Sequence, residues 1–206
     1  IMEMSETLAK LAAGTDLDSD EMTALMQSIM TGEATPAQIG SALTALRIKG
    51  ETVEEITAAA SVMRDLSLRV PVSYDEMIDT CGTGGSGVSK FNVSTASAIV
   101  IASAGLRVAK HGNRAASGVS GSADVLEAAG LRLDMSPYAV AASIEEVGVG
   151  FLFAVNHHSA MKHAIGPRRE LKFRTIFNLL GPLTNPAGAK RQVLGVFDRQ
   201  WLTPMA

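Results

Sequence analysis

The chain has few aromatic residues and almost no cysteine. Of its 206 residues, 4% are aromatic and one is cysteine, Cys81. A single cysteine excludes an internal disulfide and suits a reducing compartment. No apolar run is long enough to span a bilayer, and no basic-then-apolar leader is visible, so we expect a cytoplasmic protein. With so few aromatic rings, the core must be filled by Ala, Val, Leu, Ile and Met.

Net charge is also small, at −3, but it is unevenly distributed. Residues 1–65 carry 11 acidic and 4 basic side chains, a balance of −7, whereas residues 66–206 carry 10 acidic and 14 basic, a balance of +4. Solvated surface charge is the simpler interpretation. The more specific interpretation is an acidic helical region beside a region that binds an anionic ligand.

Three capped helices are predicted within the first 66 residues. Each apolar stripe at helical spacing follows a capping box: Asp18 with Glu21, Thr35 with Gln38, and Thr52 with Glu55. Gly32 and Gly50 are natural stops. We therefore expect a small helical domain at residues 1–70, in which a stripe of methionines serves as core or as a subunit interface.

Strands and helices alternate after an extended connector near residues 67–76. Strands are predicted at 77–80, 106–110 and 151–155, and helices begin near residues 94, 122 and 136. Such alternation favours an α/β sheet with parallel strands. We place this domain at residues 71–206, and expect residues 160–185 to pack with the helical domain.

The first predicted strand runs into DTCGTGGSG, residues 79–87, which has four glycines in nine residues. A glycine loop between a strand and a helix start offers bare amides and a positive helix terminus, to which phosphate is the natural ligand. The spacing fits neither a dinucleotide fingerprint nor a Walker loop. Taken alone, the loop is equally consistent with a structural turn.

A second polar loop, KHGNR at residues 110–114, follows the next predicted strand. It combines two cations, an imidazole, an amide and a glycine, and Gly118, Ser120 and Ser122 come soon after. Ligands of open α/β sheets gather outside the carboxyl ends of strands. Two such loops from adjacent units would make a pocket for a polyphosphorylated sugar.

A third cluster, residues 156–174, holds three of the four histidines, His157, His158 and His163. Adjacent histidines without Cys or carboxylate at useful spacing do not suit zinc. Arg168 could clamp a carboxylate with two parallel hydrogen bonds, or else pair with Glu170 at the surface.

Six stretches occur together and in order: DTCGTGGSG, FNVSTASA, VAKHGNRAAS, GSADVLEAAG, FLFAVNHHSAMKH and RTIFNLLGPLTNPA. On these the chain resembles the anthranilate phosphoribosyltransferases over nearly its whole length. The resemblance implies a small N-terminal helical domain and a larger α/β domain with a mainly parallel central sheet, as in nucleoside phosphorylases. It also implies transfer of phosphoribosyl from phosphoribosyl pyrophosphate to anthranilate, Mg²⁺ as cofactor, a homodimer joined through the helical domain, and a site between the domains.

Site residues carry over by the same resemblance. Contacts to phosphoribosyl pyrophosphate are implied for Gly82, Gly85, Ser86, Lys90, Asn92, Val93, Ser94, Thr95, Lys110, His111, Gly112, Asn113, Arg114, Ala115, Ala116, Ser117, Gly118 and Ser122. Contacts to anthranilate are implied for Gly82, Asn113, His158 and Arg168. Ser94 is implied as a magnesium ligand. No residue is assigned as an essential general base, and His111 is the candidate for moving a proton.

The sequence departs from the family at several positions. Ser86 stands where Asp is usual, Lys90 where a small hydroxyl residue is common, and Lys172 where glycine is common. The chain also stops at VFDRQWLTPMA, whereas relatives continue through more strands and an acidic pair that holds magnesium. The resemblance therefore implies a C-terminally truncated chain, which we expect to be impaired or inactive.

Two alternatives stay open. One is a pyrimidine nucleoside phosphorylase-like enzyme, against which KHGNR and Arg168 argue. The other is a non-catalytic relative that binds nucleic acid through a basic face; its mark would be salt-sensitive DNA binding without turnover.

Overall fold

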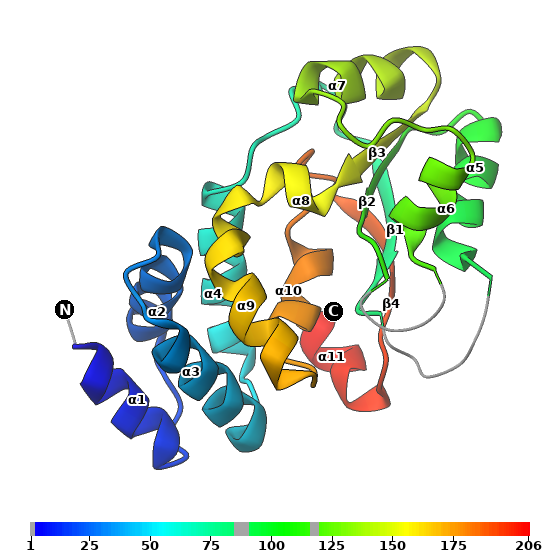
Figure 1. Cartoon of the computed structure of the whole chain (residues 1–206). Coiled ribbons are helices and arrows are strands. Elements are labelled where there is room, and N and C mark those ends of the chain that lie inside the picture. The colour runs from blue at the N-terminus through cyan, green and yellow to red at the C-terminus, as the bar shows by residue number, and fades with distance from the viewer. Residues whose placement is uncertain (1–2, 85–90, 116–119) are drawn as a thin grey trace. The chain divides into compact units, whose positions relative to one another are not determined.

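The computed structural model describes residues 3–84, 91–115 and 120–206. These residues form two compact units (Figure 1). Unit 1 comprises residues 1–66, 159–183 and 203–206, and unit 2 comprises residues 67–158 and 184–202. Among the described residues, no helix has both the length and the apolar character needed to cross a bilayer.

Unit 1 is helical. Its helices are α1 (Met4–Ala12), α2 (Ser19–Thr31), α3 (Pro36–Lys49), α4 (Val53–Asp65), α9 (Lys162–Leu171) and α10 (Ile176–Leu183), with a 3-10 turn at Ser159–Met161. Helix α2 packs on α4, α1 packs on α3, and α9 contacts both α2 and α3. Methionine and branched aliphatic side chains fill the core, including Met22, Met26, Ile39, Leu43 and Leu46.

The three predicted capping boxes are confirmed. Asp18, Thr35 and Thr52 each accept a hydrogen bond from the backbone N–H three residues on, and the side chain of that residue bonds back. Helix α1 was not predicted. It begins after Glu3, which is a poor N-cap residue, and the Glu6 carboxylate accepts from the Glu3 N–H.

Helix α9 ends in an unusual way. Lys172 caps it in the left-handed conformation, with φ 56° and ψ 14°. Among the described residues it is the one non-glycine residue with positive φ. A side chain there crowds the following carbonyl, so glycine would fit with less strain.

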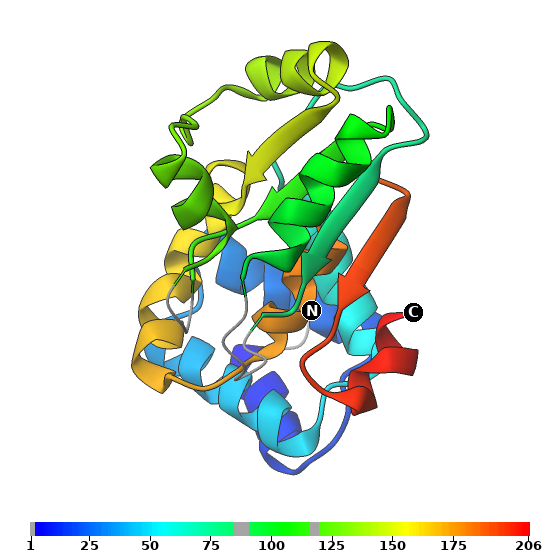
Figure 2. The same ribbon diagram turned by 90° about the vertical axis from the view of Figure 1, so that its right-hand side faces the viewer.

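Unit 2 is built on a four-stranded parallel sheet. Its strands are β1 (Ile78–Gly82), β2 (Val108–Gly112), β3 (Val149–Phe153) and β4 (Arg191–Gly195), in the order β3-β2-β1-β4. The helices are α5 (Val93–Ser103), α6 (Ser122–Ala128), α7 (Pro137–Glu146) and α8 (Ala154–His157), followed by a 3-10 turn at Arg199–Trp201. Helix α11 (Leu202–Met205) begins at the last residue of unit 2 and continues through residues that belong to unit 1. Helix α5 lies along β1 and β2 (Figure 2). The predicted parallel α/β arrangement is confirmed.

One predicted strand ends in the wrong place. The apolar run 151–155 predicts an extended segment throughout, but β3 stops at Phe153 and α8 begins at Ala154. The His158 N–H bonds to the Ala154 carbonyl at 3.0 Å, which closes a helical turn. Val155 is 53% exposed, so its apolar character did not signal burial in the sheet.

Candidate functional site

Because all four strands are parallel, the loops that follow β1 and β2 leave the same edge of the sheet. The first loop begins at Gly82. A Cβ there would lie 2.9 Å from the Gly195 carbonyl oxygen of β4, so the strands can approach this closely only with glycine. Gly84 has φ +69°, which also favours glycine. At the end of β1, Gly82 and Gly84 therefore expose backbone groups that no side chain covers.

Side-chain hydrogen bonds join the segments that follow the two strands. The Asn92 amide donates to the Ser120 carbonyl at 3.2 Å and accepts from the Ser120 hydroxyl at 3.1 Å. Further along the two segments, the Thr95 hydroxyl bonds the Ser122 hydroxyl at 3.0 Å. The start of α5 and the start of α6 are therefore held together, as the two-loop hypothesis requires.

Lys110 lies at the centre of this arrangement. Its ammonium donates to the Thr80 carbonyl at 2.6 Å and to the Ser94 hydroxyl at 3.3 Å, and the residue is buried. Burial lowers the pKa of Lys110, and the charge of Asp79 opposes that change. A buried cation beside a helix start is a strong point of attraction for phosphate.

The second loop is closed at its base by Asp124. Its carboxylate accepts from the N–H groups of Ala115 at 2.9 Å and Gly121 at 2.7 Å, and the Ala123 N–H bonds the Asn113 carbonyl at 3.2 Å. These bonds hold the pKa of Asp124 below its usual range. The KHGNR turn is thus fixed in shape before any ligand binds.

Arg114 is engaged with α6. Its guanidinium bonds Glu127 at 2.7 and 2.9 Å and Asp124 at 3.1 Å, and lies 5.8 Å from the Phe153 ring centre. The carboxylates raise the pKa of Arg114. Its predicted contact to phosphoribosyl pyrophosphate stays a prediction, and this side chain already has two anionic partners.

His111 and His158 form a buried pair in unit 2. Their ring centres are 5.3 Å apart and the planes are tilted by 54°. Burial lowers the pKa of His158 to about 3, with smaller contributions from His111 and His157. His158 is therefore neutral at physiological pH, and offers an uncharged surface rather than a cation.

Arg168 belongs to unit 1. Its guanidinium lies 5.1 Å from the Phe177 ring centre, and burial lowers its pKa. In the described part of the chain it has no acidic partner, so the surface pair with Glu170 is not seen. A half-buried cation without a carboxylate is suited to an anionic ligand.

Some predicted site residues lie outside the described residues: Gly85, Ser86, Lys90, Ala116, Ser117 and Gly118. The others except Arg168 all lie in unit 2, at or just after the ends of β1 and β2, at the starts of α5 and α6, or, for His158, directly after α8. Analysis of the sequence missed Asp124 as the residue that closes the second loop. Its position three residues after Gly121, at a helix start, is the signal that could have found it.

The donors of unit 2 fit magnesium only in a limited way. Within the described ranges no three His, Cys, Asp or Glu side chains gather as a metal site. Ser94 supplies one hydroxyl oxygen, beside the Lys110 ammonium. Mg²⁺ commonly keeps several waters and binds through phosphate oxygens, so one protein ligand is compatible with it.

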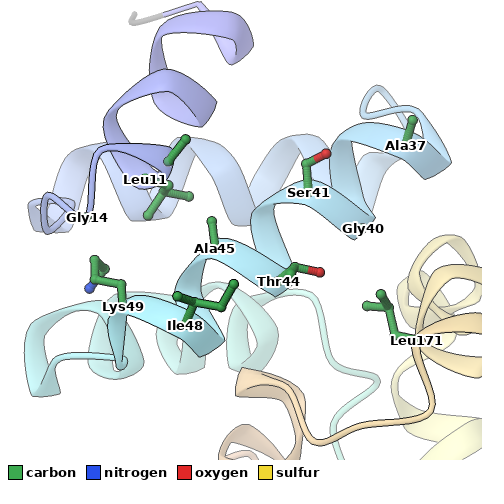
Figure 3. Close-up of a pocket in the computed structure, with 11 residues that line it drawn as sticks. Leu11, Gly14, Ala37, Gly40, Ser41, Thr44, Ala45, Ile48, Lys49 and Leu171 are labelled. Atoms are coloured by element: carbon green, nitrogen blue, oxygen red, sulfur yellow. The ribbon is translucent and has the colours of Figure 1, made fainter.

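Unit 1 has a separate concavity of about 620 Å³, shown in Figure 3. Small and apolar side chains of α1 and α3 line most of it, and Leu171 lies at one side. Its one charged group, Lys49, is already bound by Asp16 at 2.7 Å and Glu55 at 2.9 Å. The concavity offers surface for packing but no group for catalysis.

Two family models match the two parts of the chain. Residues 74–206 match the glycosyl transferase family, a/b domain, and residues 5–67 match the helical bundle domain of the same family. The chain therefore belongs to the glycosyl transferase family whose members join these two domains.

Two similar relatives within that family have the same name. The anthranilate phosphoribosyltransferases of Thioalkalivibrio sulfidiphilus and Cellvibrio japonicus are 63% and 62% identical over 205 residues. These alignments cover 100% of this chain and 61% and 60% of the relatives, so the chain spans about three fifths of their length.

Two solved structures of anthranilate phosphoribosyltransferases have a fold similar to that of this chain. The anthranilate phosphoribosyltransferase of Thermus thermophilus superposes with a TM-score of 0.92 at 48% identity, covering 97% of this chain and 60% of that one. The Saccharomyces cerevisiae enzyme in complex with PRPP and Mg gives 0.89 at 28% identity, covering 98% and 60%.

Proposed function

We propose that the chain carries the phosphoribosyl pyrophosphate-binding part of an anthranilate phosphoribosyltransferase, which makes N-(5-phosphoribosyl)anthranilate and pyrophosphate in tryptophan biosynthesis. One observation carries the proposal. The two glycine-containing segments at the ends of β1 and β2 are bonded together around the buried Lys110 ammonium. The names of the relatives supply the substrate.

The chemistry asks mainly for positioning. As the bond from C1 of the ribose to pyrophosphate breaks, negative charge concentrates on the leaving group and positive charge on the sugar. Bare amides near Gly82 and the Lys110 ammonium stabilise the departing anion, because they are preorganised in a partly buried place. The fixed turn at Gly112–Ala115 orients the sugar.

Anthranilate needs its carboxylate held and its amine left free to attack C1. We assign the carboxylate to Arg168, whose planar guanidinium suits two parallel hydrogen bonds. Asn113 would help to orient the ring, and the neutral His158 would provide a wall. The weakly basic aromatic amine needs no strong base, so His111 serves at most to carry away its proton.

Magnesium is supported by the Saccharomyces cerevisiae relative, whose structure contains PRPP and Mg. In this chain Ser94 would provide the protein ligand. When bound, Mg²⁺ supplies charge neutralisation for the pyrophosphate oxygens. Lys110 and the amides near Gly82 would share that task.

We further propose that residues 1–70 form a dimerisation domain in a cytoplasmic homodimer. The concavity of Figure 3 supports this, since Ile48 at its border is 82% exposed and small residues line it. Sedimentation of the Ser41→Arg variant tests the idea. A dimer in the parent chain and a monomer in the variant are expected, whereas a monomeric parent contradicts it.

Turnover is tested by the loss of anthranilate fluorescence with phosphoribosyl pyrophosphate and Mg²⁺, using the Thermus thermophilus relative as positive control. Because the chain spans only part of its relatives, calorimetric binding of phosphoribosyl pyrophosphate is measured as well. Binding without competition by DNA supports the proposal. Phosphorolysis of a pyrimidine nucleoside, or salt-sensitive DNA binding alone, would assign one of the alternatives instead.

A further inference from the structure

Strands β1 and β2 stop pairing earlier than their length allows. Both have five residues, but their register is Ile78↔Val108 and no further pair follows. By contrast β1 and β4 pair over all five positions, and so do β2 and β3. The backbone ladder between β1 and β2 is therefore interrupted on the side where the two loops begin, although the two strands stay side by side. We call this unpaired stretch the β1–β2 seam.

The geometry of a parallel ladder says which backbone groups lose their partners. Ile78 N–H donates to the Arg107 carbonyl at 2.9 Å, which sets the register. In a continued ladder, the Ala109 carbonyl would accept from the Thr80 N–H, and the His111 N–H would donate to the Thr80 carbonyl. Buried backbone groups left without partners would be costly.

Three side chains take those places. The Asn185 amide donates to the Ala109 carbonyl at 2.8 Å, and the Asp79 carboxylate accepts from the His111 N–H at 3.1 Å. The Lys110 ammonium donates to the Thr80 carbonyl at 2.6 Å. Side-chain hydrogen bonds thus replace the backbone hydrogen bonds that the interrupted ladder between β1 and β2 lacks.

Asp79 is the central member of this set. It is fully buried, and its second oxygen accepts from the Gln192 amide of β4 at 3.2 Å. Burial raises the pKa of Asp79, and the hydrogen bonds that it accepts from Asn185, the His111 N–H and Gln192 oppose that change. Through the His111 N–H it fixes the strand end from which Lys110 and His111 project.

We propose that Asp79 is a positioning residue: by bonding the His111 N–H across the β1–β2 seam, it sets the place of Lys110 and of the turn that follows. The inference rests on the proposed function for the identity of the ligand, phosphoribosyl pyrophosphate. It does not need Asp79 to touch that ligand. Asn185 supports the same seam from the segment before β4.

The test compares Asp79→Ala, Asp79→Asn and the core variant Ile144→Val, which lowers stability in unit 2 without removing any of the seam hydrogen bonds. Two quantities are measured for each folded protein: hydrogen exchange of the His111 amide, and the Kd for phosphoribosyl pyrophosphate. In Asp79→Ala we expect faster His111 exchange and about tenfold weaker binding, about 1.4 kcal/mol. Asn keeps one acceptor oxygen and should restore part of both. Ile144→Val should lower the melting temperature and leave the Kd unchanged.

Unchanged His111 exchange in Asp79→Ala would overturn the inference, and so would a Kd within twofold of the parent. If the alanine variant does not fold, the same comparison of His111 exchange and Kd is made on Asp79→Asn, where no change in either would overturn it. Failure of the proposed function looks different: the parent chain would not bind phosphoribosyl pyrophosphate, while the exchange of His111 would still decide whether Asp79 holds the seam.

Discussion

Among the glycines that the structure describes in the candidate site, Gly121 is the position where a single methyl group should cause the most disturbance. A Cβ there would lie 2.4 Å from the Ala115 nitrogen, 2.5 Å from the Arg114 carbonyl carbon and 2.7 Å from the Asn113 oxygen. All three are backbone atoms, so no rotamer change can relieve the contact. In Gly121→Ala the KHGNR turn must therefore move by about 1 Å, at the overpacking cost of about 1–3 kcal/mol.

For a chain of this size that cost corresponds to a fall of about 2–12 °C in the melting temperature. A displacement of about 1 Å should also reduce turnover by about 100-fold, because the reacting groups are no longer aligned. Differential scanning calorimetry gives the first quantity. Calorimetric titration with phosphoribosyl pyrophosphate tests the same displacement on the chain itself, as weaker binding.

The matched control is Gly195→Ala in β4 of the same unit. The nearest atom to a Cβ there is the Cys81 oxygen, at 4.0 Å, so the added methyl group has room. If Gly121→Ala melts within about 1 °C of this control and binds phosphoribosyl pyrophosphate equally well, the second loop is not held as the structure indicates, and the reasoning fails.

Other predictions follow from single contacts. Arg168→Ala should raise the KM for anthranilate by about 10- to 100-fold, which corresponds to the loss of one charged hydrogen bond, and should change the KM for phosphoribosyl pyrophosphate by less than about twofold. Arg169→Ala is the control. Equal effects on the KM of both substrates would reject the assignment. Because the pKa of His158 is lowered to about 3, the unfolded chain binds a proton at this residue below about pH 6.5 and the folded chain does not. The free energy of unfolding should therefore fall by about 1.4 kcal/mol per pH unit as the pH is lowered from 6.5 towards 3. Urea titrations of His158→Gln should show a flatter pH profile, and profiles identical to those of the parent would contradict this. Lys172→Gly should raise the free energy of unfolding of unit 1 by about 0.5–1 kcal/mol, seen as a higher urea midpoint, because it removes left-handed strain. Lys162→Gly within α9 should lower the urea midpoint, and a loss in both variants would show that Lys172 is not strained.

Local sequence patterns were enough to predict most of the elements. Each capping box places a hydroxyl or carboxylate three residues before its partner, and this spacing acts without tertiary contacts. Helix α1 was not predicted because Glu3 is not a preferred N-cap residue. The end of β3 was misplaced because the apolar run continues to Val155 while the backbone has already turned at Ala154.

The candidate site was only partly visible in the sequence. Its two loops stood out through glycine content and charge, and the structure adds that Asn92 and Ser120 are hydrogen-bonded to each other. That the two loops bind a ligand stays a prediction. Asp79 did not stand out, since a lone acid inside a strand gives no sign of its partners. Its role depends on where β1 and β2 separate, and that is set by pairing between distant segments.

The account depends most on the claim that the two segments at the ends of β1 and β2 together bind one doubly phosphorylated ribose. A crystal structure of the chain with phosphoribosyl pyrophosphate and Mg²⁺ tests it directly. We expect the pyrophosphate within hydrogen-bond distance of the Lys110 ammonium and of the backbone near Gly82, with the sugar against Gly112–Asn113. Density for the ligand at another place, with these groups untouched, would contradict the account.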